Sequence, residues 1–401
     1  MKKPFSAVAV LLFAVAVTRA QAPGPSPQPG QVVVPDSTRE RPEQIGHGAH
    51  TNHLIFKPSK GKPGGSPQGE TPQSLRPVYN LSVTGGNGII AIVDPYHYAT
   101  AQNDFDTFSR QFGLPASTDT VCNGSQPCFR MVYATGSKPH KNCGWNQEAA
   151  LDIEWAHAMA PRAQIVLVEA ASNRLTDLFQ AVDVATRIIQ SDSNMGAGEV
   201  SMSWSSSEFS TEAQFDSHFT NTGVVYLGAS GDRGGVNGYP SVSPDVVSAG
   251  GTTVNRDSAG TFLSETAWSG SGGGPSSYES RPSYQNAIVA IVGSQRGAPD
   301  FSFDSDPASG VSVYDSTRCS GGSGWLVFGG TSVAAPSLAG IVNLSSHFYG
   351  NSGIELSTIY SNLGNSSDFR DITSGDAGSF SAGPGWDFVT GVGSNQGTSG
   401  K

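Results

Sequence analysis

Short apolar runs alternate with helical patterns through the middle of this chain, and this alternation constrains the fold more than any other feature. Alternating strands and helices build a mostly parallel sheet with helices on both faces. We therefore predict a three-layer α/β fold, with functional side chains at the carboxyl ends of strands. The predicted strands cover 88–93, 163–169, 199–204, 223–228 and 246–253, and the predicted helices 104–112, 147–160, 175–189 and 209–219.

The segment Gly329-Gly-Thr-Ser-Val-Ala-Ala-Pro336 joins a tight glycine turn to an apolar run, 333–342, that we interpret as a buried helix. A serine where a Gly-rich turn enters a helix is held out as a nucleophile in several enzyme classes, which makes Ser332 a candidate. Ser and Thr are also favoured N-cap residues, so an ordinary capped helix is the alternative.

Glu148 and Asp152 lie four residues apart on the predicted helix 147–160 and so share a face. Their neighbours are mostly apolar. In a dry cleft the two carboxyls would be coupled, with one pKa raised, and could serve as a general base for a hydroxyl at acidic pH. A solvated helix face is the alternative. His157, on another side of the helix, is the competing candidate base.

Asp232 lies in a Gly-rich loop after the predicted strand 223–228. A carboxylic acid that stays protonated there could donate a hydrogen bond to a developing oxyanion. A residue of an Asx-turn is the alternative. Arg233 would lower the pKa of Asp232 if it pointed at the carboxyl, so we expect it to point away.

The N-terminal part differs in composition from the rest. Residues 1–22 read as a secretory signal, whose apolar run is shorter than the roughly 20 residues that cross a bilayer; a membrane anchor is the alternative. Residues 23–74, rich in Pro, Gly and Ser, are expected to be a linker or vestigial pro-segment. Within them, His47-Gly-Ala-His50 is similar to the histidine motif of subtilisin-type proteases. Because no strand precedes it and no helical pattern follows, we assign it no catalytic role.

Charge and cysteines limit the class of protein. The formal net charge is −10 with only 14% charged residues, which argues against nucleic-acid binding. Cys122 and Cys128 flank a turn sequence and could form a short disulfide in an exported protein. Cys143 and Cys319 could also pair, although sequence does not establish connectivity. None of the four has metal-ligand spacing.

Together these segments resemble the sedolisins, the serine-carboxyl peptidases, over residues 75–395, with 396–401 as a tail. The matching segments are Glu148-Ala-Ala-Leu-Asp152-Ile-Glu-Trp-Ala-His-Ala-Met-Ala-Pro161, Ser201-Met-Ser-Trp204, Ala229-Ser-Gly-Asp232, Gly329 to Pro336, Asp371-Ile372 and Gly383-Pro-Gly385-Trp-Asp387. The resemblance implies a subtilisin-like α/β fold and a secreted endopeptidase, expected to be a monomer, that hydrolyses polypeptides at acidic pH through an acyl-enzyme.

The resemblance also assigns roles. Ser332 would be the nucleophile, Glu148 its general base, Asp152 the residue that orients Glu148, and Asp232 the oxyanion-hole acid. The strand edge at Ser203, Trp204 and Ser205 would pair with an extended substrate, and Gly272 to Gly274 could form the opposite rim. A single structural Ca²⁺ would be held by oxygens of Asp371, Ile372, Gly383, Gly385 and Asp387.

Three departures from the family pattern stand out. Ser205 replaces a usual glycine and could narrow the substrate cleft, and Arg233 replaces a usual small residue. In place of a large folded prodomain, only residues 23–74 lie between the predicted signal and the domain.

These departures leave other functions open. A catalytically silent relative that binds polypeptide or glycan is one alternative function. An exported Gly/Ser-rich structural protein is another, although no regular repeat is present. Cleavage preference and the choice between endopeptidase and tripeptidyl-peptidase stay open.

Overall fold

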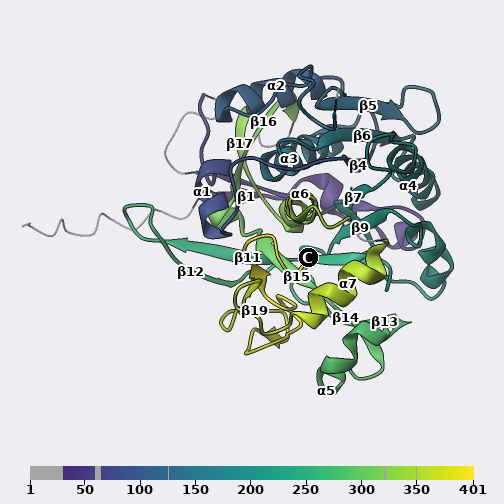
Figure 1. Cartoon of the computed structure of the whole chain (residues 1–401), viewed down its shortest axis with the longest axis vertical. Coiled ribbons are helices and arrows are strands. Elements are labelled where there is room, and N and C mark those ends of the chain that lie inside the picture. The colour runs from purple at the N-terminus through teal and green to yellow at the C-terminus, as the bar shows by residue number, and fades with distance from the viewer. Residues whose placement is uncertain (1–29, 59–64, 125, 320–321, 349) are drawn as a thin grey trace, which may run out of the picture.

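The computed structural model describes residues 30–58, 65–124, 126–319, 322–348 and 350–401. The predicted signal, 1–22, lies outside these residues. A large sheet runs through the molecule in the strand order β18-β21-β15-β11-β9-β7-β4-β6-β5, with β12 paired to β11 (Figure 1). All its pairs are parallel except those made by β12 and β18. Its strands are β4 (Ile89–Pro95), β5 (Phe129–Tyr133), β6 (Gln164–Ala170), β7 (Gly198–Met202), β9 (Val224–Ala229), β11 (Val247–Arg256), β12 (Phe262–Ala267), β15 (Phe301–Asp304), β18 (Phe369–Arg370) and β21 (Ser394–Asn395).

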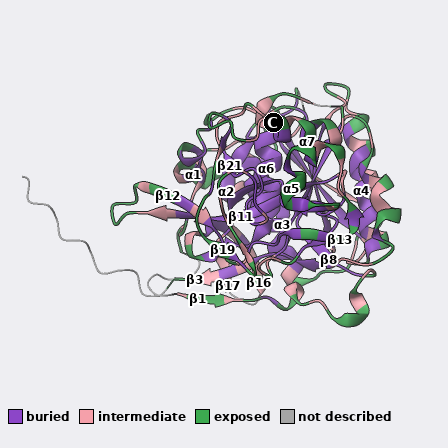
Figure 2. Cartoon of the chain, turned by 90° about the horizontal axis from the view of Figure 1, so that it is seen from below, coloured by how far each residue is buried: buried purple, intermediate pink, exposed green. Residues whose placement is uncertain are grey.

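The sheet is buried on both faces, as its near-continuous apolar strands require. Along β4, Ile90 and Ile92 join one hydrophobic core while Ile89 and Val93 join the other, because successive side chains of a strand point to opposite faces. Helices α3 (Cys143–Met159) and α6 (Thr331–Ser345) pack together over the first core. Helix α4 (Leu175–Gln190) covers the second. Figure 2 shows this buried interior beneath an exposed rim. The prediction of a three-layer, mostly parallel α/β fold is confirmed.

The predicted elements are present, with shifted ends. The run predicted as one strand over 199–204 is two strands, β7 and β8 (Trp204–Ser207), which separate at Ser203. The helix predicted over 209–219 is a 3₁₀ helix, Glu212–Phe219. The Gly/Ser-rich stretch Gly270 to Ser277, for which no strand is predicted, is in part strand: β13 (Gly274–Ser280) pairs with β14 (Gln295–Ala298). The Gly/Ser composition of this stretch does not predict a strand, because β13 forms only through its pairing with β14.

The described part of 23–74 is folded, against the expectation of a linker. Strand β1 (Gln31–Val33) pairs with β3 (Leu54–Lys57), and β3 pairs with β17 (Gly322–Gly329), which in turn pairs with β16 (Val311–Cys319). This sheet lies at the lower edge of Figure 2. A second small sheet has the order β10-β8-β2, with β2 at His50–Thr51 and β10 at Gly238–Tyr239. The partner strands lie far away in sequence, so local composition gives no sign of them.

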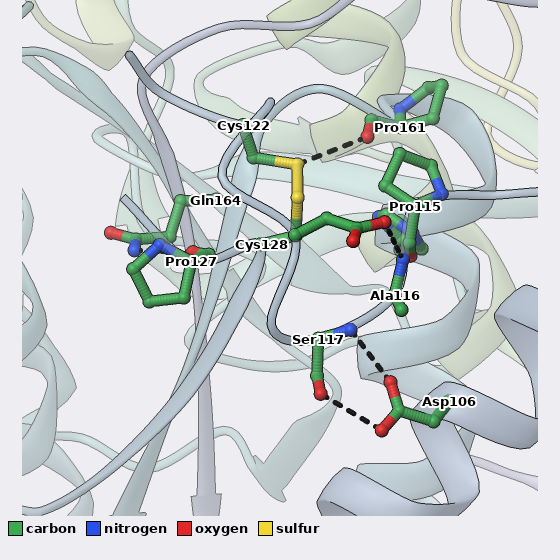
Figure 3. Close-up of a disulfide and its surroundings, with 11 residues drawn as sticks. Asp106, Pro115, Ala116, Ser117, Cys122, Pro127, Cys128, Pro161 and Gln164 are labelled. Atoms are coloured by element: carbon green, nitrogen blue, oxygen red, sulfur yellow. Dashed lines mark hydrogen bonds between the residues drawn. A yellow bond between two sulfur atoms is a disulfide. The ribbon is translucent and has the colours of Figure 1, made fainter. Parts of the chain in front are cut away.

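Four more α-helices and two short strands are present: α1 (Pro72–Val78), α2 (Ala101–Phe112), α5 (Val289–Val292), α7 (Ser352–Ser361), β19 (Asp376–Ala377) and β20 (Phe380–Ser381). Short 3₁₀ helices at Asp36–Thr38, Pro42–Gln44, Ser283–Ile288 and Pro307–Ser309 complete the described elements. Both possible cysteine pairs are disulfides. Cys122–Cys128 closes a short loop beside Pro161 (Figure 3), and Cys143–Cys319 ties the start of α3 to the end of β16. Within the described residues, no helix combines the length and apolar character needed to cross a membrane.

Candidate active site

Ser332 lies in the first turn of α6, at the carboxyl end of the sheet, and its side chain is fully buried. The turn before it needs Gly330, which adopts φ +102°. The Ser332 hydroxyl donates to the carbonyl of Ser203 at 3.2 Å. The backbone N–H of Ser332 donates to the carbonyl oxygen of Asn52 at 3.0 Å. A residue of the N-terminal segment therefore lies directly against the predicted nucleophile.

Asp232, in the loop after β9, faces the same turn. Its Oδ1 accepts hydrogen bonds from the Thr331 N–H at 2.7 Å and the Thr331 hydroxyl at 2.9 Å. Its Oδ2 is buried and has no hydrogen-bond partner among the described residues. Burial raises the pKa of Asp232 to about 8, with the charge of Glu148 adding to the shift. The carboxyl thus keeps a proton at acidic pH and can donate a hydrogen bond, as an oxyanion-hole acid must.

Gly330 has no side chain, and this leaves room for the Asn52 carbonyl and the Asp232 carboxyl to approach it closely. A Cβ built on Gly330 would lie 2.2 Å from the Asn52 carbonyl oxygen and 2.5 Å from Asp232 Oδ2. Both oxygens therefore lie against the same side of the glycine. The Asn52 carbonyl accepts from the Ser332 N–H and lies on the same side of Gly330 as the carboxyl of Asp232, the residue predicted to be the oxyanion-hole acid.

Glu148 projects from α3 and is fully buried. Its Oε2 lies 2.8 Å from Nδ1 of His53, which is equally buried, while its Oε1 has no partner in the described part of the chain. Glu148 and Ser332 are therefore bridged by two consecutive residues, Asn52 and His53. The hydroxyl of Ser332 is turned to Ser203 in this state.

Two further carboxyls lie close to Glu148. Asp152 accepts a hydrogen bond from the Ser203 hydroxyl at 2.9 Å. Burial, then the charges of Asp94 and Glu148, raise the pKa of Asp152 well above its ordinary value. Burial and the charge of Glu148 likewise raise the pKa of Asp94, at the end of β4. Asp94 is not among the predicted site residues, although its place at the carboxyl end of a predicted strand was a usable signal.

The predicted substrate strand binds the chain's own N-terminal segment. Strand β2 pairs antiparallel with β8, His50 opposite Ser205 and Thr51 opposite Trp204. The Asn52 amide nitrogen donates to the Ser203 carbonyl at 3.2 Å and to the Ser205 hydroxyl at 3.1 Å. The side chain of Trp204 is buried beneath, with its indole N–H donating to the Val93 carbonyl. Ser203 and Ser205 thus contact an extended segment of the chain itself.

This segment is anchored along its length. Ala49 exchanges hydrogen bonds with Asn173, through the backbone at 2.8 Å and the Asn173 amide at 2.7 Å. Glu40 accepts from the Ser207 N–H at 2.8 Å and lies 3.8 Å from Arg233. Beyond His53, β3 continues along β17, with Leu54 opposite Gly329. No periodic pattern marks residues 49–54, so sequence reasoning missed Asn52 and His53 although it noted the neighbouring His47-Gly-Ala-His50 motif.

The remaining candidates lie as follows. His157 is buried, with Nε2 2.9 Å from the Pro115 carbonyl, and burial lowers its pKa to about 4. It packs on Phe105 and has no contact with Ser332, so it is not the base. Arg233 points away from Asp232, as expected, and donates to the Ser207 hydroxyl. The rim at Gly273 and Gly274 lines a cavity of about 410 Å³ that also includes Ser207.

The residues predicted to hold calcium share one C-terminal loop. Asp371 accepts from the Gly385 N–H at 3.1 Å, and Asp387 accepts from the Gly383 N–H at the same distance. No atom lies within 4 Å of a Cβ built on either glycine, so the turn has open space beside two carboxylates. Among the described residues no three His, Cys, Asp or Glu side chains form a metal cluster, so an ion here would also need carbonyls such as that of Ile372. Two carboxylates with backbone oxygens fit the hard donor set of Ca²⁺.

The chain is similar in sequence and fold to several known proteins. No protein-family model matches the chain. Sedolisin of Pseudomonas sp. (strain 101) is 26% identical over 369 residues, which cover 82% of this chain and 60% of sedolisin. Kumamolisin of Bacillus sp. (strain MN-32) is 33% identical over 286 residues, 63% of this chain and 49% of kumamolisin. The chain thus spans less than two thirds of either relative.

A solved structure extends the likeness to three dimensions. It is described as Pseudomonas sedolisin (serine-carboxyl proteinase) complexed with two molecules of pseudo-iodotyrostatin, and it matches with a TM-score of 0.68 at 25% identity. The match covers 82% of this chain and 96% of that one. The fold, the order of the motifs and these likenesses lead to one conclusion: the chain is similar to the sedolisins in sequence and in structure, and it has a subtilisin-like α/β fold.

Proposed function

We propose that this protein is a secreted serine-carboxyl endopeptidase that hydrolyses polypeptides at acidic pH through an acyl-enzyme on Ser332. One observation carries the proposal: an extended peptide segment runs along β8 with a carbonyl oxygen 3.0 Å from the Ser332 N–H and beside the Asp232 carboxyl. This is how a substrate carbonyl must lie when its oxygen is to become an oxyanion. Secretion is supported by the predicted signal and the two disulfides.

In the proposed mechanism, the Ser332 hydroxyl turns from the Ser203 carbonyl toward Glu148, which takes its proton as Ser332 Oγ attacks the substrate carbonyl. The Ser332 N–H and the protonated Asp232 stabilise the oxyanion. Glu148 returns the proton to the leaving amine, and water then hydrolyses the ester. Asp152, held by Ser203, orients Glu148 and shares its charge. The pathway needs a protonated Asp232, and its pKa of about 8 keeps it protonated throughout the acidic range.

A calcium ion belongs to the proposal as a structural element. Asp371 and Asp387, with carbonyls of Ile372, Gly383 and Gly385, would hold it in the C-terminal loop. Bound there, the ion would supply fixed positive charge between the two carboxylates. It would have no part in the chemistry at Ser332.

The test compares the parent with Ser332→Ala on a denatured protein substrate at about pH 4, in the range where a carboxylate is an effective base. We expect peptide release by the parent and none by the variant. Equal proteolysis by both would contradict the proposal. An inert parent that still binds peptide would favour the alternative, a silent polypeptide-binding relative.

A further inference from the structure

Glu208 ties together the two walls of the predicted substrate cleft. It follows β8 directly, and its Oε1 accepts the Ser277 N–H of β13 at 3.0 Å and a second hydrogen bond from the Ser276 hydroxyl. The cavity of about 410 Å³ lies between these walls, which Figure 2 shows beside each other, and Val236 and Phe380 also line it. One carboxylate therefore holds the two walls of this part of the cleft together.

The part of β13 that Glu208 contacts depends on side chains rather than on strand pairing. The ladder between β13 and β14 is interrupted over residues 276–279, which we call the β13 bulge. Within it, the Ser276 hydroxyl accepts from the N–H groups of Tyr278 and Glu279 at 3.2 and 2.9 Å. Because the same hydroxyl donates to Glu208, the backbone of the bulge is organised from the end of β8.

Glu208 in turn meets a second carboxyl. Glu212, at the start of its 3₁₀ helix, is fully buried, and its carboxyl forms a hydrogen bond with that of Glu208. Its Oε2 accepts the Phe209 N–H at 2.7 Å, while no described donor reaches its Oε1, which is free to carry a proton. Two carboxylates repel each other, so the contact requires one proton between them. Burial, followed by the charges of Glu208 and Glu279, raises the pKa of Glu212 to about 9, so Glu212 holds that proton at acidic pH.

We propose that Glu208 and Glu212 are positioning residues of the substrate cleft: the proton that they share holds the β13 bulge against the end of β8, and its loss above neutral pH releases the bulge. The proposal rests on the peptidase function above for the role of the cleft. It adds the residues that keep one wall of the cleft in place, and it gives neither of them a part in the chemistry at Ser332.

Glu279, at the end of the bulge, strengthens the effect of pH. It is 4% exposed, and burial, followed by the charges of Asp216 and Glu208, raises its pKa to about 7. As pH rises from about 7 to about 9, Glu279 and then Glu212 lose their protons beside Glu208, and three negative charges lie together. The other ionisable groups that face this cluster are Asp216, Asp245, Tyr239 of β10, Arg296 of β14, and the pair of Glu40 and Arg233 beside Ser207.

Hydrogen exchange of the full chain tests the hold directly. The host is Ser332→Ala, so that no peptidase activity interferes. Amide protection is compared at about pH 6 and about pH 9, below and above the titration of Glu279 and Glu212, after correction for the intrinsic pH dependence of exchange. We expect protection of the β13 bulge to fall at least about tenfold at the higher pH, the effect of losing one charge-assisted hydrogen bond, while β4 keeps its protection. Unchanged protection of the bulge, or an equal fall in β4, would overturn the proposal.

Three amide variants in this host identify the carboxyl responsible. Glu212→Gln can donate to Glu208 at every pH, so its bulge should stay protected at about pH 9. Glu279→Gln should leave the loss in place, because Glu212 still ionises. Glu355→Gln is the matched control and should behave as the host does: its carboxyl, on α7, has no hydrogen-bond partner in the described residues, and burial raises its pKa to about 8. A loss in Glu212→Gln equal to that in the host would overturn the proposal.

Peptide hydrolysis at about pH 4 tests the link to substrate. Glu208→Ala removes the hold at every pH. It should raise KM about tenfold and change kcat by less than about twofold, because the wall binds substrate and does not touch the reacting atoms. Glu208→Gln, whose amide oxygen still accepts from Ser277, should bring KM back to within about threefold of the parent. Glu355→Gln should leave both constants unchanged.

The two experiments separate this inference from the proposed function. A parent that hydrolyses peptides, together with a parental KM in Glu208→Ala, overturns the positioning role and leaves the peptidase function standing. An inert parent removes the peptidase function, and hydrogen exchange still decides whether the shared proton holds the bulge. Circular dichroism of each variant shows whether it is folded, so that a weak variant is not mistaken for an unfolded one.

Discussion

Gly340 of α6 lies so close to α3 that a Cβ built on it would be 2.6 Å from the Cβ of Met159. This contact sets the separation of the two helices that carry Ser332 and Glu148. The two residues of the proposed chemistry therefore depend on a glycine in the middle of a helix, where glycine is otherwise unfavourable.

Gly340→Ala should destabilise the protein, although alanine is the better helix former by about 1 kcal/mol. Overpacking between α3 and α6 should cost about 1–3 kcal/mol and lower peptidase activity by moving Ser332 relative to Glu148. Urea unfolding and the rate of peptide release measure the two effects. Gly353→Ala, at the start of α7 where the nearest atom is the Asn351 amide oxygen at 3.3 Å, is the control and should be neutral or stabilising. A gain of stability in Gly340→Ala would contradict the close packing.

Asp232 should make the fold more stable at acidic pH than at alkaline pH. Its pKa is about 8 in the folded protein and near 4 in the unfolded chain. Between these values the unfolded chain releases a proton that the folded protein keeps, so the free energy of unfolding falls as pH rises from about 4 to about 8. Asp232→Asn removes this contribution and should flatten the change of melting temperature over that range. Asp36→Asn, an exposed carboxyl, should not; equal slopes in parent and Asp232→Asn would show that the group does not titrate as described.

Glu148→Gln should lower kcat/KM by about two to four orders of magnitude, because an amide can accept from His53 but cannot take the Ser332 proton. The matched control is Glu154→Gln on another side of α3, where the carboxylate accepts from the Tyr314 N–H at 2.9 Å. That change should affect stability more than rate. A Glu148→Gln variant with parental kcat/KM would exclude Glu148 as the base.

The two disulfides should contribute different amounts to the free energy of unfolding. Cys143–Cys319 closes a separation of 176 residues and Cys122–Cys128 one of 6. In the chain-entropy picture the long link contributes about 5 kcal/mol and the short one about 2 kcal/mol. Double serine variants of each pair, compared by denaturant unfolding, test this order. A larger loss from opening the short link would mean that strain or residual structure, rather than loop entropy, governs.

Removal of calcium should lower the melting temperature. A ligand that binds only the folded state stabilises it by about 4 kcal/mol at a thousandfold excess over its Kd. EGTA should therefore destabilise the parent, and added Ca²⁺ should restore it. Asp371→Asn should reduce the response, because it removes a carboxylate charge beside the Gly385 turn. Identical melting curves in EGTA and in Ca²⁺ would contradict calcium binding by this C-terminal loop.

Much of the fold follows from local pattern. Strands β4 and β6 are built on the continuous apolar runs 89–93 and 165–168, and helices such as α4 have clear apolar faces, so short-range signals suffice. The motifs around Ser332, Glu148 and Asp232 could also be found in sequence, since each combines a reactive side chain with a turn or a helix face. The structure brings all three to one buried region.

The N-terminal contribution could not be found in this way. Strand β3 is four residues long and owes its place to β17, more than 250 positions later. The composition of 23–74 is typical of a linker, and no pattern in it indicates that His53 meets Glu148. The pairing arises from tertiary contacts alone, which local propensity does not encode.

The peptide in the cleft is covalently part of the protein it occupies. An added substrate must displace a tethered ligand whose effective concentration, for short linkers, is on the order of millimolar. While residues 50–52 lie along β8, substrates and reversible inhibitors that bind more weakly than the tethered segment will show little measurable binding. A screen for ligands of this protein therefore has to begin by measuring whether the segment occupies the cleft under the conditions of the assay.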